Sequence, residues 1–365
     1  MRVLLGAAGT AGHVNPMLAT ANILKKKGVD VMVLGTDIGI EKELVPNAGF
    51  KLFTIKKLVF PRRNIFKMLF LPFKLFGLIK AVCKILKQEK IDLVCGFGGY
   101  VCAPLYLGAR FMNIPIVVHE QNACAGIANK MGAKFAKVVA LTFKTNLSAS
   151  KGKTVITGMP LRENIMNLKK SMENNYSTLR ENALRHFNLS CEKKTLLITG
   201  GSLGANSINT AFLKSMKNLP DGIQVIHLSG KGKNLILDEE VKKNNLSDRW
   251  KVFEYLEDIY LAYACADFVV CRSGAATVCE ISAIGIPACY IPLPIGNGEQ
   301  KYNAAECVEK GSAILIEDKQ FTPKMVDEIY SIILDEARLE KMKKANNSAI
   351  VDGASKLADQ ILQQV

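Results

Sequence analysis

The first half of the fold is decided by the stretch Met1-Arg2-Val3-Leu4-Leu5-Gly6-Ala7-Ala8-Gly9-Thr10-Ala11-Gly12-His13. Its apolar run Val3–Leu5 predicts a buried strand, and the glycines predict a tight turn into a helix that we expect over Pro16–Lys27. Such a loop lets the backbone approach a phosphate, because a helix N-terminus presents unpaired N–H groups and a partial positive charge. A structural turn without a ligand explains this single loop equally well.

The same arrangement begins again in the second half of the chain. The strand expected over Thr195–Thr199 is followed by Gly200-Gly201-Ser202-Leu203-Gly204-Ala205 and by a helix expected over Ser207–Met216. Neither glycine loop ends in Gly-Lys-Ser/Thr, so neither is a P-loop. We expect further strands at 31–34, 93–95, 116–118, 138–141, 154–156, 224–228, 251–254, 268–271, 288–291 and 313–316, and closing helices at 323–346 and 354–363.

This alternation of short β-branched runs and amphipathic segments predicts an α/β protein with two Rossmann-like, doubly wound parallel-sheet domains. The sequence indicates a first domain over residues 1–159 and a second over residues 160–346. Residues 347–365 hold a C-terminal helix that is a candidate to pack back on the first domain.

The charge is concentrated in one segment. The chain has a formal net charge of +15, and residues 51–88 hold ten lysines and arginines with no acidic residue. Phenylalanines and leucines lie among these basic residues, which is typical of an interfacial membrane element. A core helix with snorkelling lysines is the alternative, and the aliphatic content favours lipid over nucleic acid.

Other features narrow the class of protein. The ten cysteines form no Cys-x-x-Cys pair, and we interpret them as reduced, cytosolic residues outside any metal site. The N-terminus lacks the apolar length of a signal peptide, and the apolar stretch at residues 65–83 is interrupted by lysines and Pro72. No Asp-x-Asp motif occurs, the motif that many sugar-nucleotide transferases use to hold a divalent metal on a diphosphate. If the chain binds such a ligand, the absence of this motif favours neutralisation by helix N-termini and by donors such as Arg162, without a metal.

Several residues stand where chemistry is expected. A histidine at a helix N-terminus, such as His13 before an expected Asn15-Pro16 helix start, tends to be neutral and able to accept a proton. It also suits a capping role without chemistry. Glu280, one turn into the helix after Arg272-Ser273-Gly274, can accept hydrogen bonds from a ribose diol or simply lie solvated. Asp37 keeps a dinucleotide-binding interpretation open.

Six motifs in order carry a resemblance to a known family. They are Gly9-Thr10-Ala11-Gly12-His13, Gly96-Phe97-Gly98-Gly99-Tyr100, His119-Glu120-Gln121-Asn122, Gly200-Gly201-Ser202-Leu203-Gly204-Ala205, Arg272-Ser273-Gly274-Ala275 through Glu280, and Gln300 with Asn303-Ala304. Together they closely resemble the bacterial MurG family of GT-B-fold N-acetylglucosaminyltransferases. The resemblance runs from about residue 2 to beyond residue 310.

The resemblance implies an inverting, metal-independent transfer of GlcNAc from UDP-GlcNAc to the MurNAc 4-hydroxyl of undecaprenyl-diphosphate-linked MurNAc-pentapeptide. This reaction converts lipid I to lipid II in peptidoglycan synthesis and serves cell shape and division. It implies a peripheral enzyme on the cytoplasmic face of the cell membrane, bound through residues 51–88, with no cofactor and no nucleic-acid partner. The first domain would bind the acceptor and the second the donor across a cleft.

The resemblance also implies site residues. His13 would be the catalytic base, and Tyr100 and Glu120 would lie near the acceptor. Binding of UDP-GlcNAc would involve Thr10, Ala11, Gly12, Asn122, Arg162, Ser202, Leu256, Ala275, Ala276, Thr277, Val278, Cys279, Glu280 and Gln300. Four positions depart from the family pattern and bear on donor recognition: Ala11, Met159, Leu203 and Glu299.

Three other interpretations remain at this point. The chain could be another GT-B enzyme, such as a diacylglycerol glycosyltransferase or a UDP-sugar 2-epimerase. It could be a membrane-bound scaffold that binds nucleotide without turnover, or a two-domain nicotinamide oxidoreductase. An acceptor requirement separates the transferase from the epimerase, which turns over UDP-GlcNAc alone.

Overall fold

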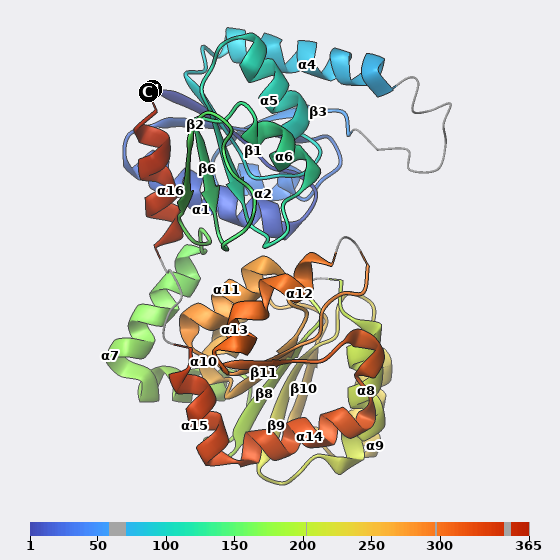
Figure 1. Ribbon diagram of the computed structural model, residues 1–365. Coiled ribbons are helices and arrows are strands. Elements are labelled where there is room, and N and C mark those ends of the chain that lie inside the picture. The colour runs from blue at the N-terminus through green and yellow to red at the C-terminus, as the bar shows by residue number, and fades with distance from the viewer. Residues whose placement is uncertain (58–70, 202, 296–297, 347–351, 365) are drawn as a thin grey trace. The chain divides into compact units, whose positions relative to one another are not determined.

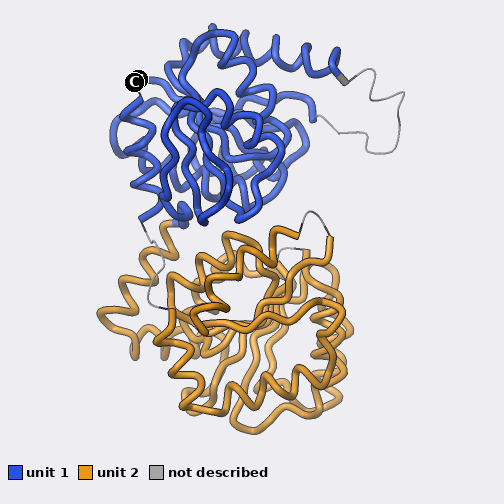
Figure 2. The backbone as a smooth tube through the Cα atoms, viewed as in Figure 1, with its two compact units in different colours: residues 1–162, 350–365 blue, residues 163–349 orange. Residues whose placement is uncertain are grey.

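The computed structural model describes residues 1–57, 71–201, 203–295, 298–346 and 352–364. The chain divides into two compact units, one formed by Met1–Arg162 with Ile350–Val365 and the other by Glu163–Ala349 (Figure 2). Each unit has helices on both faces of a parallel sheet (Figure 1). The α/β fold with two doubly wound parallel sheets is therefore confirmed.

Unit 1 contains a seven-stranded sheet with the strand order β3-β2-β1-β4-β5-β6-β7. Every strand pair in it is parallel. The strands are β1 (Arg2–Gly6), β2 (Asp30–Thr36), β3 (Lys51–Ile55), β4 (Leu93–Gly96), β5 (Ile116–Glu120), β6 (Val138–Leu141) and β7 (Lys153–Ile156). The helices are α1 (Ala11–Lys26), α2 (Glu41–Asn47), α4 (Leu71–Gln88), α5 (Cys102–Phe111), α6 (Ile127–Ala133) and α16 (Gly353–Leu362).

Unit 2 repeats this plan with a six-stranded parallel sheet in the order β10-β9-β8-β11-β12-β13. Its strands are β8 (Lys194–Thr199), β9 (Ile223–Leu228), β10 (Trp250–Phe253), β11 (Phe268–Cys271), β12 (Ala288–Tyr290) and β13 (Ala313–Leu315). Its helices are α7 (Glu163–His186), α8 (Asn206–Ser215), α9 (Leu235–Lys243), α10 (Ile259–Cys265), α11 (Ala275–Ile284), α12 (Glu299–Asn303), α13 (Ala305–Glu309), α14 (Pro323–Leu334) and α15 (Glu336–Lys344), with 3₁₀ turns η1 (Met216–Asn218) and η2 (Asp318–Gln320).

Helix α1 begins earlier than the sequence predicts. Thr10 has an extended conformation, and its carbonyl accepts hydrogen bonds from the N–H groups of His13 and Val14 at 3.0 and 3.1 Å. The helix therefore starts at Ala11, and Pro16 lies inside it. The expected Asn15-Pro16 start was wrong, because the carbonyl of Thr10 closes the first turn before the proline is reached.

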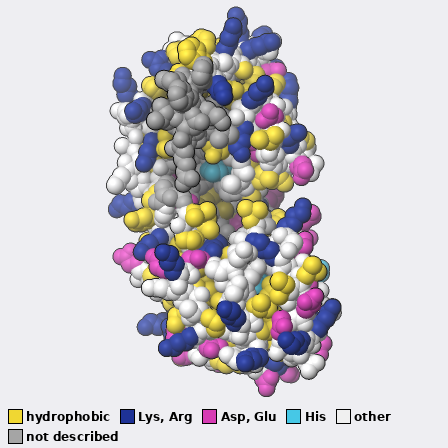
Figure 3. Space-filling view, turned by 90° about the vertical axis from the view of Figure 1, so that its right-hand side faces the viewer, with side chains coloured by type: hydrophobic (Ala, Val, Ile, Leu, Met, Phe, Trp, Pro, Cys, Tyr) yellow, Lys and Arg dark blue, Asp and Glu magenta, His cyan; other side chains and the backbone are white. Residues whose placement is uncertain are grey.

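Helix α4 occupies the second part of the basic segment. Its Ile79, Val82 and Leu86 are buried in the core of unit 1, whereas Phe73 and Phe76 are 77% and 68% exposed. Figure 3 shows hydrophobic and basic side chains next to one another on the upper part of unit 1, where α4 runs. The start of the segment, residues 51–55, is strand β3, and residues 58–70 lie outside the described part.

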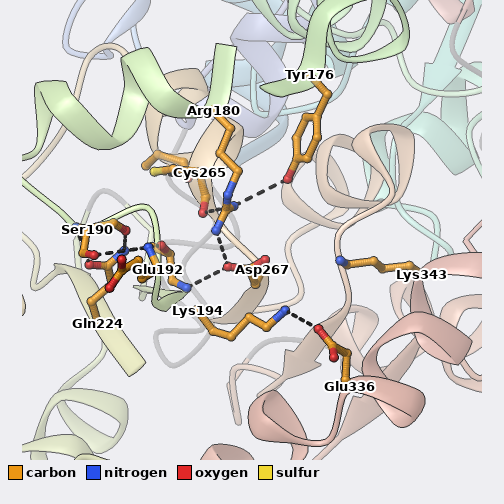
Figure 4. Close-up of polar contacts among 12 residues, drawn as sticks. Tyr176, Arg180, Ser190, Glu192, Lys194, Gln224, Cys265, Asp267, Glu336 and Lys343 are labelled. Carbon is orange, nitrogen blue, oxygen red and sulfur yellow. Dashed lines mark hydrogen bonds and ion pairs between the residues drawn. The ribbon is translucent and has the colours of Figure 1, made fainter. Parts of the chain in front are cut away.

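Helix α7 covers residues 163–186, where the sequence pattern did not lead us to expect a helix or strand. Its Arg180 reaches the base of the unit 2 sheet, where one guanidinium nitrogen donates to the carbonyl of Cys265 and another to Asp267, both at 2.6 Å (Figure 4). Asp267 also accepts from the backbone N–H of Thr195 at 2.8 Å. This largely buried ion pair ties the polar helix to β8 and β11.

Helix α16 packs into the core of unit 1. Leu357, Ala358 and Ile361 of α16 are fully buried in the core that β1 and α1 build, so this helix completes unit 1.

Within the described residues, no helix combines the length and apolarity needed to cross a bilayer.

Candidate active site

The glycine loop of unit 1 follows β1 at the centre of its sheet. Gly9 has a φ of 99°, which glycine adopts without a steric cost and which turns the chain toward α1. The exposed Thr10 precedes the helix, and Ala11 and Gly12 form its first turn. The loop thus places the backbone of Thr10, Ala11 and Gly12 at the carboxyl edge of β1.

The half-buried His13 lies in the first turn of α1. Its Nδ1 is 3.0 Å from the hydroxyl oxygen of Thr10, and its ring lies against the backbone of Gly98, which follows β4. A methyl group at Gly98 would come within 3.1 Å of Nε2, so the glycine leaves room for the ring. When Nδ1 donates to Thr10, the Nε2 atom is the proton acceptor.

The electrostatic surroundings favour the neutral form of His13. Desolvation lowers its pKa, and the Glu120 carboxylate opposes this with a smaller effect. A neutral imidazole is the form that a general base requires.

The loops after β4 and β5 lie beside this histidine because β1, β4 and β5 are neighbours in the sheet. A methyl group at Gly99 would approach the carbonyl oxygen of Ala8 to 2.5 Å, so these two loops are in close contact. Tyr100 is 47% exposed, and the Lys57 ammonium lies 5.7 Å from the centre of its ring.

Glu120 organises the loop after β5. The buried carboxylate accepts hydrogen bonds from the backbone and side chain of Asn122 at 3.0 and 3.4 Å, from the N–H of Gly126 at 3.0 Å and from Asn129 at 2.9 Å. Its oxygens are engaged within unit 1, so the side chain positions Asn122 at the carboxyl edge of the sheet. Asn122 itself is half-buried.

The glycine loop of unit 2 follows β8, the neighbour of β11 at the centre of that sheet. Gly204, with a φ of 67°, lies against the backbone of Ser229 and Gly230 after β9, where no side chain would fit. Lys233 donates to the carbonyl of Leu203 at 2.9 Å, and the Leu203 side chain is 81% exposed. Ser202 lies outside the described residues.

The first turn of α11 presents backbone N–H groups after β11. The N–H of Val278 bonds to the carbonyl of Gly274 at 3.0 Å, so the amides of Ala275, Ala276 and Thr277 precede the first helical bond. Three such amides at a helix N-terminus suit a phosphate. The side chains of Ala275 and Val278 are buried, and burial raises the pKa of Cys279, which keeps its thiol protonated.

Glu280 is buried, so the solvated role considered from the sequence does not apply. The hydroxyl of Tyr263, on α10, donates to one of its carboxylate oxygens at 3.3 Å. No sequence motif points to Tyr263, because it lies on a different helix from Glu280 and 17 residues away, and only folding brings the two together.

The remaining expected residues lie on other elements. Leu256 is half-buried between β10 and α10, and Arg162 is half-buried at the last residue before α7. Gln300 on α12 accepts a hydrogen bond from the Leu293 N–H at 3.0 Å, which leaves its NH₂ group as a donor. The nearby Asn303 donates to the carbonyl of Ser273 at 3.2 Å and so holds the turn before α11.

Arg272 has a structural role. Its guanidinium donates to the carbonyls of Ile291 and Pro292, both at 3.1 Å, and forms an ion pair with Asp318 at 2.5 Å. These contacts join the ends of β11 and β12. Among the described residues, no group of three or more His, Cys, Asp or Glu side chains lies close enough together to hold a metal ion.

Two Rossmann-like units, each with a glycine loop at the centre of its parallel sheet, form the GT-B fold, and the comparisons with known proteins identify the class as glycosyltransferase. Family models agree: the glycosyltransferase family 28 N-terminal domain matches residues 3–141, and the family 28 C-terminal domain matches residues 195–361.

The particular family follows from individual proteins. The chain is 41% identical over 380 residues to the UDP-N-acetylglucosamine–N-acetylmuramyl-(pentapeptide) pyrophosphoryl-undecaprenol N-acetylglucosamine transferase of Bifidobacterium longum, covering 99% of this chain and 97% of that protein. The crystal structure of Acinetobacter baumannii MurG superposes with a TM-score of 0.77 at 29% identity and covers 99% of both chains. The chain belongs to the MurG family, whose members transfer GlcNAc from UDP-GlcNAc to lipid I and form lipid II.

A more distant structure shares the fold alone. The UDP-GlcNAc 2-epimerase from Neisseria meningitidis superposes with a TM-score of 0.67 at 15% identity. The resemblance to the MurG family is thus confirmed, and the epimerase likeness is limited to the two-unit architecture.

Proposed function

We propose that this chain performs the MurG reaction by an inverting, metal-independent displacement. The 4-hydroxyl of the MurNAc sugar on an undecaprenyl-diphosphate-linked acceptor attacks C1 of UDP-GlcNAc. The new bond joins that oxygen to C1, the bond between C1 and the diphosphate oxygen breaks, and UDP leaves. The hydroxyl proton passes to His13. The observation that carries this proposal is the half-buried, neutral-favouring imidazole held between Thr10 and Gly98.

Most of the donor contacts belong to unit 2 in this proposal. The leading amides of α11, at Ala275, Ala276 and Thr277, face the diphosphate, since a helix N-terminus compensates negative charge. Glu280 accepts hydrogen bonds from the ribose, Leu256 lies against the uracil, and the Gln300 amide donates to the sugar hydroxyls. Arg162, Asn122 and Ser202 complete the donor contacts.

The acceptor belongs to unit 1. The loop after β1 exposes Gly9 and Gly12, and Tyr100 lies exposed in the loop after β4. An undecaprenyl chain keeps the acceptor in a bilayer, so the enzyme works at the cytoplasmic membrane surface. Exposed Phe73 and Phe76 with the lysines of α4 supply an interfacial contact of the kind that anionic bilayers bind.

The test is an assay of UDP release from UDP-GlcNAc with and without a lipid I analogue. We expect release only with the analogue, at a rate that EDTA leaves unchanged within about twofold, because backbone amides neutralise the leaving group. Acceptor-free conversion of UDP-GlcNAc, followed by NMR, would instead assign the chain to the 2-epimerases. A rate that needed added Mg²⁺ or Mn²⁺ would refute the metal-independent mechanism.

A further inference from the structure

A buried carboxylate that the proposed mechanism does not use lies behind the glycine loop of unit 1. Glu41 is the first residue of α2, and its side chain is fully buried. One carboxylate oxygen accepts from the Thr36 N–H at 2.9 Å and from the Thr36 hydroxyl at 2.6 Å. The other accepts from the N–H of Gly9 at 3.3 Å. Glu41 thus joins the end of β2 to the loop after β1.

Two glycines, Gly35 and Gly39, provide the space that the Glu41 carboxylate occupies. A methyl group at Gly35 would come within 2.6 Å of the Glu41 side chain, and one at Gly39 would overlap its carboxylate. A glycine is therefore needed at each of these two positions for the Glu41 side chain to be buried here. Glu43, on the same helix, is exposed to solvent.

The carboxylate is held in its ionised form. Burial acts to raise the pKa of Glu41, but the hydrogen bonds from Thr36, from the Glu41 backbone and from Gly9 outweigh burial and lower it. Hydrogen bonds to an ionised acceptor are about twice as strong as neutral ones, which makes this a firm anchor for the Gly9 amide.

We propose that Glu41 is a positioning residue for the transfer reaction: it fixes Gly9, and through Gly9 the Thr10–His13 turn that carries the base. This rests on the proposed role of His13. Gly9 is the residue before Thr10, whose carbonyl starts α1 and whose hydroxyl contacts the His13 ring. Loss of the anchor lets this turn shift, and a shift of about 1 Å in a reacting group can cost about 100-fold in rate.

A double-mutant cycle tests this. We expect Glu41→Gln to lower kcat by about 10- to 100-fold while KM for UDP-GlcNAc changes by less than about threefold, because most of the proposed donor contacts lie in unit 2 and none involves Glu41. In a His13→Ala background the same change should have no further effect, since the residue it positions is gone. Glu43→Gln, the matched exposed control on α2, should match the wild type.

The outcomes distinguish the positioning role of Glu41 from the proposed role of His13 as the base. An equal loss of rate from Glu41→Gln with and without His13, an altered donor KM, or a wild-type kcat would overturn the positioning role. A wild-type rate for His13→Ala alone would instead reject the proposed base, whatever Glu41 does.

A second pair of variants serves if Glu41→Gln fails to fold, as judged by near-ultraviolet circular dichroism. Thr36→Ser keeps the hydroxyl bonded to the carboxylate and should retain the wild-type kcat. Thr36→Val removes that bond and should lower kcat without changing the donor KM. Equal rates for these two variants would refute the proposal.

Discussion

At the scale of single residues, the site combines side chains that contact one another with side chains that hold the backbone. His13 contacts Thr10 and Gly98, and Glu280 contacts Tyr263. Glu120, Arg272 and Asn303, by contrast, are engaged in hydrogen bonds that shape the loops. Polar residues in an ordered motif therefore include both kinds, and only their contacts distinguish them.

Replacement of His13 tests the base at this scale. We expect His13→Ala to lower kcat by ~10²–10⁴-fold, the usual contribution of a general base. His186→Ala, a change of an exposed histidine on α7, is the matched control and should leave kcat unchanged. Equal rates for the His13 variant and the control would remove His13 from the mechanism.

The pH dependence has a defined sign. Because desolvation lowers the pKa of His13, the neutral base persists below the ordinary histidine value of 6.5, and activity is lost as pH falls through the lowered pKa. The acid limb of kcat/KM in the wild type should therefore have its midpoint below 6.5 and be absent from His13→Ala. A midpoint above that value would contradict the assignment.

At the scale of elements, α4 has two faces with different roles. Ile79, Val82 and Leu86 secure it to the core, and the opposite face exposes two phenylalanines with Lys80 and Lys84. The core-helix alternative therefore holds for the buried face of α4, and the membrane contact stays a proposal for its exposed face.

Vesicle binding tests the exposed face. We expect Phe73→Ala with Phe76→Ala to weaken binding to vesicles containing phosphatidylglycerol by at least about tenfold, since buried apolar area sets the affinity of interfacial helices. Lys80→Gln with Lys84→Gln should weaken it by about 30-fold at low salt, from about 1 kcal/mol per lysine. Lys217→Gln, an exposed change in unit 2, is the control. Binding of equal strength to neutral vesicles, or unchanged by either pair, would reject α4 as the contact.

Two other elements depart from the sequence expectation. The polar stretch after Arg162 forms α7, with a break at Asn175, because Arg180 is anchored on Asp267. The single helix expected over 323–346 is divided into α14 and α15 at Asp335, whose side chain accepts from the Arg338 N–H at 3.0 Å and caps the second helix. A local pattern does not predict the Asp267 anchor, which lies 87 residues from Arg180, whereas the cap at Asp335 is a local signal that the prediction of a single helix overlooked.

At the scale of the whole molecule, the end of the chain stabilises its beginning. We expect Leu357→Ala to destabilise unit 1 by about 2–5 kcal/mol, the usual cost of a cavity in a well-packed core. Lys356→Ala, an exposed neighbour on α16, should be nearly neutral. Thermal unfolding of the two variants decides: equal melting temperatures would mean that α16 contributes little to the core.

The alternating pattern and the glycine loops were enough to predict the two doubly wound sheets, and the ordered motifs were enough to indicate the family. These signals are local, because a strand, a turn and a helix start are each specified by residues that lie close together in the sequence. Strand β3 was missed because its basic, aromatic residues resembled the membrane segment that follows.

Only the tertiary structure decided which polar residues are held by contacts within the fold. Three contacts join residues that are distant in the sequence: the hydrogen bond from Gly9 to Glu41, the hydrogen bond from Tyr263 to Glu280, and the packing of α16 in the core of unit 1. Burial and hydrogen bonding depend on the neighbours that folding brings together, so no pattern along the chain contains them.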